Sequence, residues 1–218
     1  PDRHYLVPSI VPPDVIHQAV FDKQLELLPA FARQGVEQAY DVLIRTGDGQ
    51  LADTLLDAMA LSTMLELAYQ TGDAFIQQTA EWMAATTNLK IALRAIKTGK
   101  DADFLELALC QTKTLDKAAL IEAAVQGLDS LMALVSGTPY EEGAEQMAHS
   151  VTAFEKWCDN RLMGHVQRAK YIGLGVEPLI AYYIAKEAEI KTVRIVLYCK
   201  RQNLPADAIR ERVRRLYV

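Results

Sequence analysis

The chain has 218 residues, half of them apolar and 23% of them charged, with a formal net charge of −5. This is the composition of an ordinary globular protein, long enough to bury a full core as one large domain or two small ones. The acidic balance disfavours nucleic-acid binding, and because no apolar run reaches about 18 residues, no segment is expected to span a membrane.

The first half of the chain is predicted to be a series of helices separated by proline and glycine. Asp14 is a plausible N-cap for the first helix, the turn Thr46–Gly49 follows the second, and Gly99 is well placed to stop the fourth. No convincing alternation of apolar and polar residues interrupts the series, so the sequence predicts an all-α fold. The predicted helices cover residues 15–28, 36–45, 51–69, 74–97 and 103–109.

The last third of the chain contains a second long helix. Glu177 and Pro178 mark its start, because proline suits the first helical turn, where the amide that it lacks would be unpaired anyway. No glycine or proline then follows until Pro205, which opens a shorter helix predicted to run to the end of the chain. The long helix should therefore end near Arg201.

One face of this long helix combines large apolar side chains with two charges. Glu187 and Arg194 lie on that face, two turns apart. They either form an ion pair that locks the helix against its neighbours or contact another protein chain; we favour the pair because buried charges usually need partners. The apolar members, at 100° per residue, are Leu179, Ile180, Tyr183, Ile190 and Tyr198.

The two halves of the sequence resemble each other at a shift of 101 or 102 residues. Tyr69 then aligns with Tyr171, and Leu89-Lys90 aligns with Ile190-Lys191. The order of helices and breaks also recurs, although few identities do. We therefore predict two helical repeat domains, residues 1–118 with an irregular leader at 1–13, and residues 119–218.

The sequence contains no recognisable catalytic or cofactor motif. No histidine has a second histidine three or four positions away, and there is no glycine-rich phosphate loop or nucleophile elbow. Glu141 and Glu142 are best explained as first-turn helix residues. The three cysteines are far apart and odd in number, which predicts buried thiols in a reducing compartment. We expect no cofactor and no metal.

The last third of the chain contains a series of short motifs: Glu177 to Tyr182, Lys186-Glu187, Ile190-Lys191, Val193 to Ile195, Leu204-Pro205, Ile209 to Arg212 and Leu216 to Val218. In these residues it resembles the carboxy-terminus of the C subunit of V/A-type rotary ATPases, called the d subunit in eukaryotes. The first repeat adds Asn88-Leu89-Lys90 with Leu93-Arg94, which resembles the motif of that family's internal domain. The family tends to have glycine where the long helix ends, whereas this chain has Cys199-Lys200-Arg201.

The resemblance implies a fold and a role. The family has three similar helical domains, pseudo-symmetric bundles around a central cavity, so this chain, which lacks a starting methionine, is expected to be a processed form or a fragment without the first. The family's protein resembles a socket that sits on the membrane proteolipid ring and receives the central-stalk subunits. ATP hydrolysis and proton or sodium transport would belong to other subunits. The implied location is peripheral, on the cytoplasmic face of the membrane.

The candidate site residues are mostly basic. Residues 186–218 carry nine basic and four acidic side chains, a local balance of +5 on an acidic chain, which often marks a docking surface. The alternatives are a generic all-α repeat scaffold for another protein partner, or an all-α enzyme without a known motif. The residues predicted for partner contact or inter-domain locking are Lys90, Arg94, Lys97, Glu187, Lys191, Arg194, Arg201, Arg210, Arg212, Arg214 and Arg215.

Overall fold

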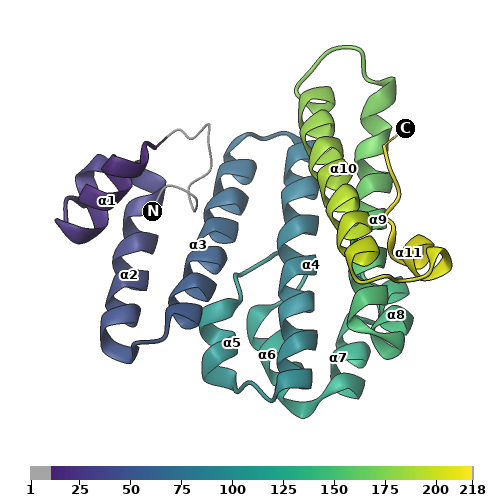
Figure 1. The fold of residues 1–218 in the computed structure, drawn as a ribbon, viewed down its shortest axis with the longest axis horizontal. Coiled ribbons are helices and arrows are strands. Elements are labelled where there is room, and N and C mark those ends of the chain that lie inside the picture. Colours follow the sequence, from purple (N-terminus) through teal and green to yellow (C-terminus); the bar gives the residue numbers. More distant parts are fainter. Residues whose placement is uncertain (1–10, 218) are drawn as a thin grey trace. The chain divides into compact units, whose positions relative to one another are not determined.

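The computed structural model describes residues 11–217, and within that range every regular element is helical, which confirms the all-α prediction (Figure 1). The α-helices are α1 (Pro13–Phe21), α2 (Ala30–Thr46), α3 (Gly49–Gln70), α4 (Ala74–Thr98), α5 (Ala102–Ala108), α6 (Lys117–Gln126), α7 (Leu128–Val135), α8 (Ala144–His149), α9 (Val151–Val166), α10 (Glu177–Arg201) and α11 (Ala206–Arg212). Short 3-10 turns are η2 (Leu25–Leu27), η3 (Glu141–Gly143) and η4 (Gln167–Tyr171).

The chain forms two compact units, Pro1–Met64 and Leu65–Val218, and the division falls inside helix α3. The two units are defined by contacts within each of them. The domain boundary that we predict after residue 118 is instead based on the sequence repeat, and it stays a prediction. One apolar core within the second unit contains residues from both sides of residue 118, from Ala85 to Cys158.

In the first unit, the chain bends where we predicted a continuous helix over residues 15–28. Helix α1 ends at Phe21, and Lys23 adopts a φ of 56°, which is uncommon for a residue with a side chain. Arg33 stabilises the bend, because its Nε donates to the carbonyl of Leu28 at 2.8 Å. The predicted N-cap is also wrong: Pro12 occupies the cap position and Asp14 lies in the first turn.

The other helix boundaries follow glycine and proline more closely. Helix α2 begins directly after Pro29, six residues before the predicted start, and ends at Gly47 in the left-handed conformation with a φ of 67°. Helix α4 begins at a side-chain cap from Asp73, which accepts from the amide of Ile76, and ends at Gly99 with a φ of 66°. Glycine at these two positions avoids the strain that a Cβ atom would introduce.

Helix α4 is the central element of the second unit. Its buried face is built from alanine and leucine, so neighbouring helices can approach its backbone closely, and α6 and α9 pack on it. Leu89 and Leu93 are fully buried there, together with Phe154 from α9. The predicted thiols are confirmed as free and buried: Cys110, Cys158 and Cys199.

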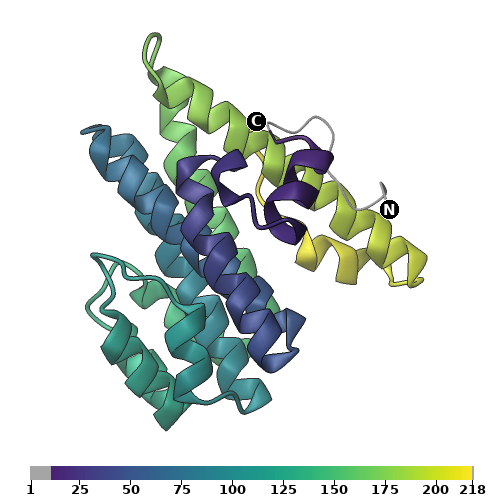
Figure 2. The ribbon, with the colours of Figure 1, turned by 90° about the vertical axis from the view of Figure 1, so that its left-hand side faces the viewer.

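Helices α9 and α10 run alongside each other, and the turn η4 lies between them in the chain (Figures 1 and 2). The long helix α10 has the predicted bounds, but its buried residues are small or medium-sized ones, Ala181, Ile184, Thr192 and Cys199. On a helical wheel, Ala181, Thr192 and Cys199 lie roughly opposite Leu179 and Ile190. Of the apolar face identified in the sequence, Leu179, Tyr183, Ile190 and Tyr198 are therefore exposed, whereas Ile180 is partly buried against the core of the unit.

The carboxy-terminal helix is shorter than predicted. Helix α11 ends at Arg212, and Val213 is already extended with a ψ of 141°. The chain leaves the helix because its next residues bond to α9 and η4: the amide of Arg215 donates to Asn160 at 2.7 Å, and Gln167 donates to the carbonyl of Leu216 at 3.0 Å. These contacts replace the helical hydrogen bonds that the predicted continuation would have formed.

Candidate functional site

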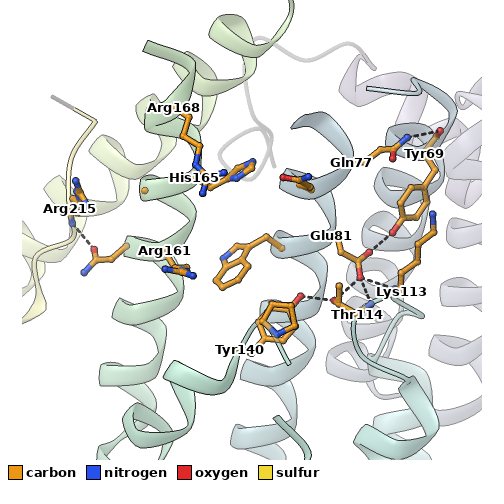
Figure 3. A pocket seen from close by; sticks show the side chains of 15 residues that line it. Tyr69, Gln77, Glu81, Lys113, Thr114, Tyr140, Arg161, His165, Arg168 and Arg215 are labelled. Carbon is orange, nitrogen blue, oxygen red and sulfur yellow. Dashed lines mark hydrogen bonds between the residues drawn. The ribbon is translucent and has the colours of Figure 1, made fainter. Parts of the chain in front are cut away.

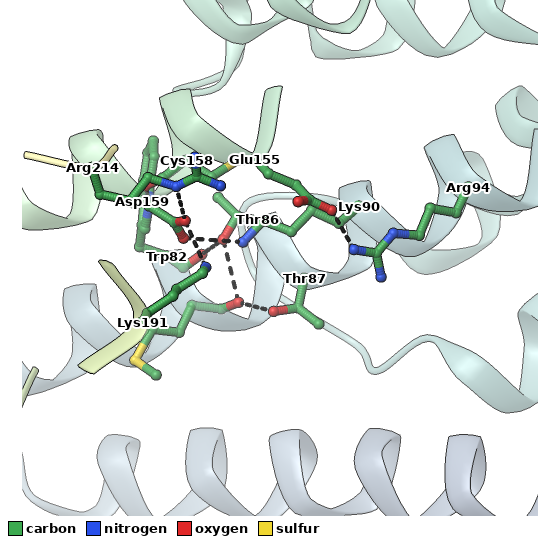
Figure 4. A network of polar contacts seen from close by, with 11 residues as sticks. Trp82, Thr86, Thr87, Lys90, Arg94, Glu155, Cys158, Asp159, Lys191 and Arg214 are labelled. Carbon is green, nitrogen blue, oxygen red and sulfur yellow. Dashed lines mark hydrogen bonds and ion pairs between the residues drawn. The ribbon is translucent and has the colours of Figure 1, made fainter. Parts of the chain in front are cut away.

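A carboxylate shared by three cations joins helices α4, α9 and α10 and the terminal segment of the second unit (Figure 4). Asp159 of α9 contacts Lys90 of α4 at 3.7 Å, Lys191 of α10 at 2.6 Å and Arg214 of the terminal segment at 2.8 Å. Arg214 is the most buried of the three, with 5% of its side chain exposed, whereas Lys191 is 48% exposed. The network therefore ties four segments of the chain together.

The charge state of Asp159 follows from this geometry. Burial alone would raise the pKa of its carboxyl group, but Lys90, Lys191 and Arg214 outweigh burial and lower the pKa below its ordinary value. Asp159 is therefore ionised at neutral pH. Three of the predicted contact residues are thus committed to an internal carboxylate that the sequence did not identify as their partner.

The remaining predicted site residues are spread over the surface of the unit. Arg94 pairs with Glu155, and Arg210 pairs with Asp207 one turn earlier in α11. Both arginines are largely exposed, so these pairs contribute little to stability. The predicted cations that are exposed and form no ion pair with a described residue are Lys97, Arg194, Arg201, Arg212 and Arg215.

Glu187 and Arg194 do not form the ion pair that we favoured. Glu187 accepts a hydrogen bond from Tyr183 at 2.8 Å, and this bond raises the pKa of the tyrosine above its ordinary value. Arg194 forms no ion pair with any residue in the described range. Both side chains are exposed beside the large apolar residues of α10.

The exposed face of α10 is unusually apolar for a protein surface. Leu179 is 70% exposed, Tyr183 60% and Tyr198 62%, although such side chains are usually at least partly buried. We define the α10 face as the apolar and tyrosine side chains of α10 that are at least half exposed: Leu179, Tyr182, Tyr183, Ile190, Val193, Leu197 and Tyr198.

A second carboxylate, the buried Glu81, lies in the first half of α4 beside a groove (Figure 3). One of its oxygens accepts from the amides of Lys113 and Thr114, each at 2.7 Å, and from the Thr114 hydroxyl. The other accepts from the hydroxyl of Tyr69. All four donors keep the carboxylate satisfied although Glu81 is 8% exposed.

Glu81 and the groove beside it were not predicted from the sequence. A signal was present, since Glu81 is an acidic residue within an alanine-rich helix, but its backbone donors lie more than 30 residues later in the chain. The groove is also lined by Trp82, Tyr140 and His165. Burial raises the pKa of Tyr140 to about 12, and burial together with Arg168 lowers the pKa of His165, so both are neutral at pH 7.

The described residues contain neither a cluster of potential metal ligands nor a helix that could span a membrane. No group of three or more histidine, cysteine, aspartate or glutamate side chains in residues 11–217 is arranged to hold a metal ion. No helix in the same range has the length and apolarity that crossing a membrane would require.

Comparison with known proteins identifies the family. The sequence model of the ATP synthase (C/AC39) subunit family matches residues 4–212. The C subunit of the V-type sodium ATPase of Enterococcus hirae is 24% identical over 208 residues, which cover 94% of this chain and 62% of the relative. The C subunit of the A-type ATP synthase of Methanocaldococcus jannaschii is 31% identical over 142 residues, 56% of this chain and 33% of that protein.

A third relative, the corresponding A-type ATP synthase protein of Haloferax volcanii, is 26% identical over 129 residues, 56% of this chain and 37% of the relative. No solved structure gives a significant match. The chain spans less than two thirds of the length of the curated relatives that it matches. Because the family model covers almost the whole chain, this protein belongs to the ATP synthase (C/AC39) subunit family.

Proposed function

We propose that this protein is a non-catalytic coupling subunit of a V/A-type ATPase or ATP synthase, which joins the central stalk to the proteolipid ring. Family membership supports an assignment to such a complex. The observation that carries the proposal is the α10 face, a tyrosine-rich apolar surface that nothing in the second unit's described residues covers.

The composition of the α10 face fits a protein partner. Tyrosine and arginine are enriched in protein–protein interfaces, and apolar patches bordered by charges mark interaction sites. Tyr183 and Tyr198 lie on this face, and the exposed cations Arg194 and Arg201 lie on the same helix. Rim charges of this kind mainly steer association, so binding should weaken with added salt.

A coupling subunit also needs a stiff connection between its surfaces. The Asp159 network supplies one, since it fixes α10 and the terminal segment to α4 and α9 through charge-assisted bonds. A force applied to the α10 face would therefore pass directly into the core of the unit. In this proposal the protein is peripheral, on the cytoplasmic face of the membrane, and takes no part in hydrolysis or ion binding.

The test is calorimetric titration of the chain with the purified central-stalk subunits of the same organism. We expect saturable, salt-sensitive binding that the double variant Tyr183→Ala/Tyr198→Ala weakens by at least about tenfold, because interface tyrosines often dominate binding energy. The matched control is Tyr171→Ala, since Tyr171 is 92% exposed but precedes α10. Equal losses in both variants would contradict the assignment of the α10 face.

A generic repeat scaffold is the second candidate. It would take precedence if the chain bound neither the stalk subunits nor detergent-solubilised proteolipid ring. Binding to the ring alone, through the α10 face, would keep the coupling function but reverse the orientation of the protein in the complex.

A further inference from the structure

The groove between α4 and α9 has the size of a small-molecule site. It encloses about 560 Å³ and lies wholly within the second unit (Figure 3). Ligand sites in proteins typically measure about 300–1,000 Å³, with apolar walls and a few well-placed polar groups. Neither the family assignment nor the proposed coupling role uses this groove.

One wall of the groove is aromatic and fixed in place. The indole of Trp82 packs against the rings of Tyr140 and Trp157, with centroid distances of 5.0 and 5.6 Å. Its Nε1 donates to the carbonyl of Cys158 at 3.3 Å, which anchors the ring. An anchored aromatic surface can accept a planar ring without first being ordered, so binding costs little entropy there.

Three arginines also line the groove, and they come from different segments. Arg161 belongs to α9, Arg168 to η4 and Arg215 to the terminal segment. Arg168 and Arg215 form no ion pair with a described residue. Arg161 lies 3.6 Å from Glu142, but the two side chains are 54% and 67% exposed, so this pair is weak and can be exchanged for a ligand.

No free carboxylate among the described lining residues opposes an anion in the groove. Glu81 is the one acidic residue among them, and hydrogen bonds from the protein already occupy both of its carboxylate oxygens. Lys113 adds a further positive charge, placed over the ring of Tyr69 at 3.5 Å from the centroid. On a chain with a net charge of −5, this is a local concentration of positive charge.

We propose that this groove binds a phosphorylated small molecule with an aromatic ring, of the nucleoside phosphate class. The ring stacks on Trp82, and the phosphate groups bind the guanidinium groups of Arg161 and Arg168, whose planar forks suit phosphate oxygens. Gln77 and Asn160 line the same groove; Gln77 donates to the carbonyl of Tyr69 and Asn160 accepts from the amide of Arg215, so the Oε1 atom of Gln77 and the Nδ2 atom of Asn160 are the groups left for the edge of the ring. A glycine-rich loop is not needed at such a site, because arginines take the place of backbone amides.

The first experiment titrates the whole chain with ADP, adenosine and pyrophosphate, by calorimetry and by quenching of tryptophan fluorescence. ADP should bind at least about tenfold more tightly than either part alone, because it uses both the aromatic wall and the arginines. Failure of ADP to bind at millimolar concentration would overturn the proposal. Pyrophosphate binding as tight as that of ADP would overturn the ligand class, since the ring would then contribute nothing.

The second experiment locates the site. The double variant Arg161→Ala/Arg168→Ala should weaken ADP binding by at least about thirtyfold, and Trp82→Phe should weaken it several-fold. Arg201→Ala is the matched control, because Arg201 is exposed at the end of α10 and does not line the groove. Circular dichroism establishes that each variant is folded. ADP binding that is unchanged in the folded double variant would refute this location.

Discussion

The substitution Asp159→Asn tests whether the shared carboxylate stabilises the unit. It keeps the shape of the side chain but removes the negative charge that faces Lys90, Lys191 and Arg214. The largest part of the cost should come from Arg214, whose side chain is 5% exposed and would become an uncompensated buried cation. Breaking a buried pair costs about 3–5 kcal/mol, so with Asp159 itself 18% exposed we expect a loss of about 3 kcal/mol.

The partners of Asp159 give an internal scale for this value. Lys191→Met should cost less than about 1 kcal/mol, because Lys191 is 48% exposed and an exposed pair contributes little. Arg214→Met should lower the free energy of unfolding by about 2 kcal/mol, because Asp159 still contacts Lys90 and Lys191 and the methionine side chain replaces part of the packing of the arginine stem. The expected order of destabilisation is therefore Asp159→Asn, then Arg214→Met, then Lys191→Met.

Urea unfolding, followed by circular dichroism, measures the three free energies of unfolding. Hydrogen exchange adds a local measurement, because the amide of Arg215 donates to Asn160 and should exchange faster once Arg214 is released. In the double variant Asp159→Asn/Arg214→Met, the losses should be smaller than additive by more than about 1 kcal/mol. A loss below about 1 kcal/mol for Asp159→Asn, with unchanged protection of the Arg215 amide, would refute the reasoning.

Three further predictions concern buried polar groups. The folded state lowers the pKa of Asp159, so the contribution of this carboxylate to stability is complete above its unfolded pKa of about 3.9 and is lost as the pH falls through the lower folded pKa. When unfolding is measured as a function of pH, the free energies of unfolding of wild type and Asp159→Asn should therefore converge below that folded pKa. Glu81→Gln should cost about 2 kcal/mol in thermal or urea unfolding, because an amide cannot accept at both ends from the donors that surround Glu81. Thr192→Val should leave stability unchanged or raise it by up to about 1 kcal/mol, since the buried Thr192 hydroxyl has no hydrogen-bond partner in the described structure; a clear loss on unfolding would contradict this.

The sequence predicted the helices well where glycine and proline determine the backbone. Gly47 and Gly99 end α2 and α4, and Pro178 lies in the first turn of α10, as the local conformations of these residues require. The bend after Phe21 could not be predicted in this way. It depends on Arg33, which bonds to backbone carbonyls earlier in the chain.

The buried face of α10 could not be predicted from hydrophobicity. The larger apolar side chains, such as Leu179 and Tyr198, are exposed, while Ala181 and Cys199 pack against the unit. Small residues occupy this position because they allow α10 to approach α9 closely, which hydropathy does not measure. The proposed partner contact depends on this exposed apolar face, and a pattern within one helix does not show which of its faces stays uncovered.

The sequence did not predict the Asp159 network. The charges of Lys90, Lys191 and Arg214 made them candidates for partner contact or inter-domain locking, a role that stays a prediction, whereas the structure brings all three to one aspartate from distant parts of the sequence. Long-range convergence of this kind follows from helix packing, which the periodicity of a single helix does not reveal. The contact roles of the exposed residues, including Arg194 and Arg201, stay predictions.

The sharing of one carboxylate among three cations also affects how the unit responds to mechanical load. Lys191 and Arg214 bond to the same oxygen of Asp159, and Lys90 lies near the other. If a pull on α10 detaches the exposed lysine, the buried arginine still holds the terminal segment, and the lysine can rebind when the pull ends. Loss of the exposed contact therefore leaves the terminal segment attached to α9, and the ion pair of Lys191 can form again without any change in the buried part of the network.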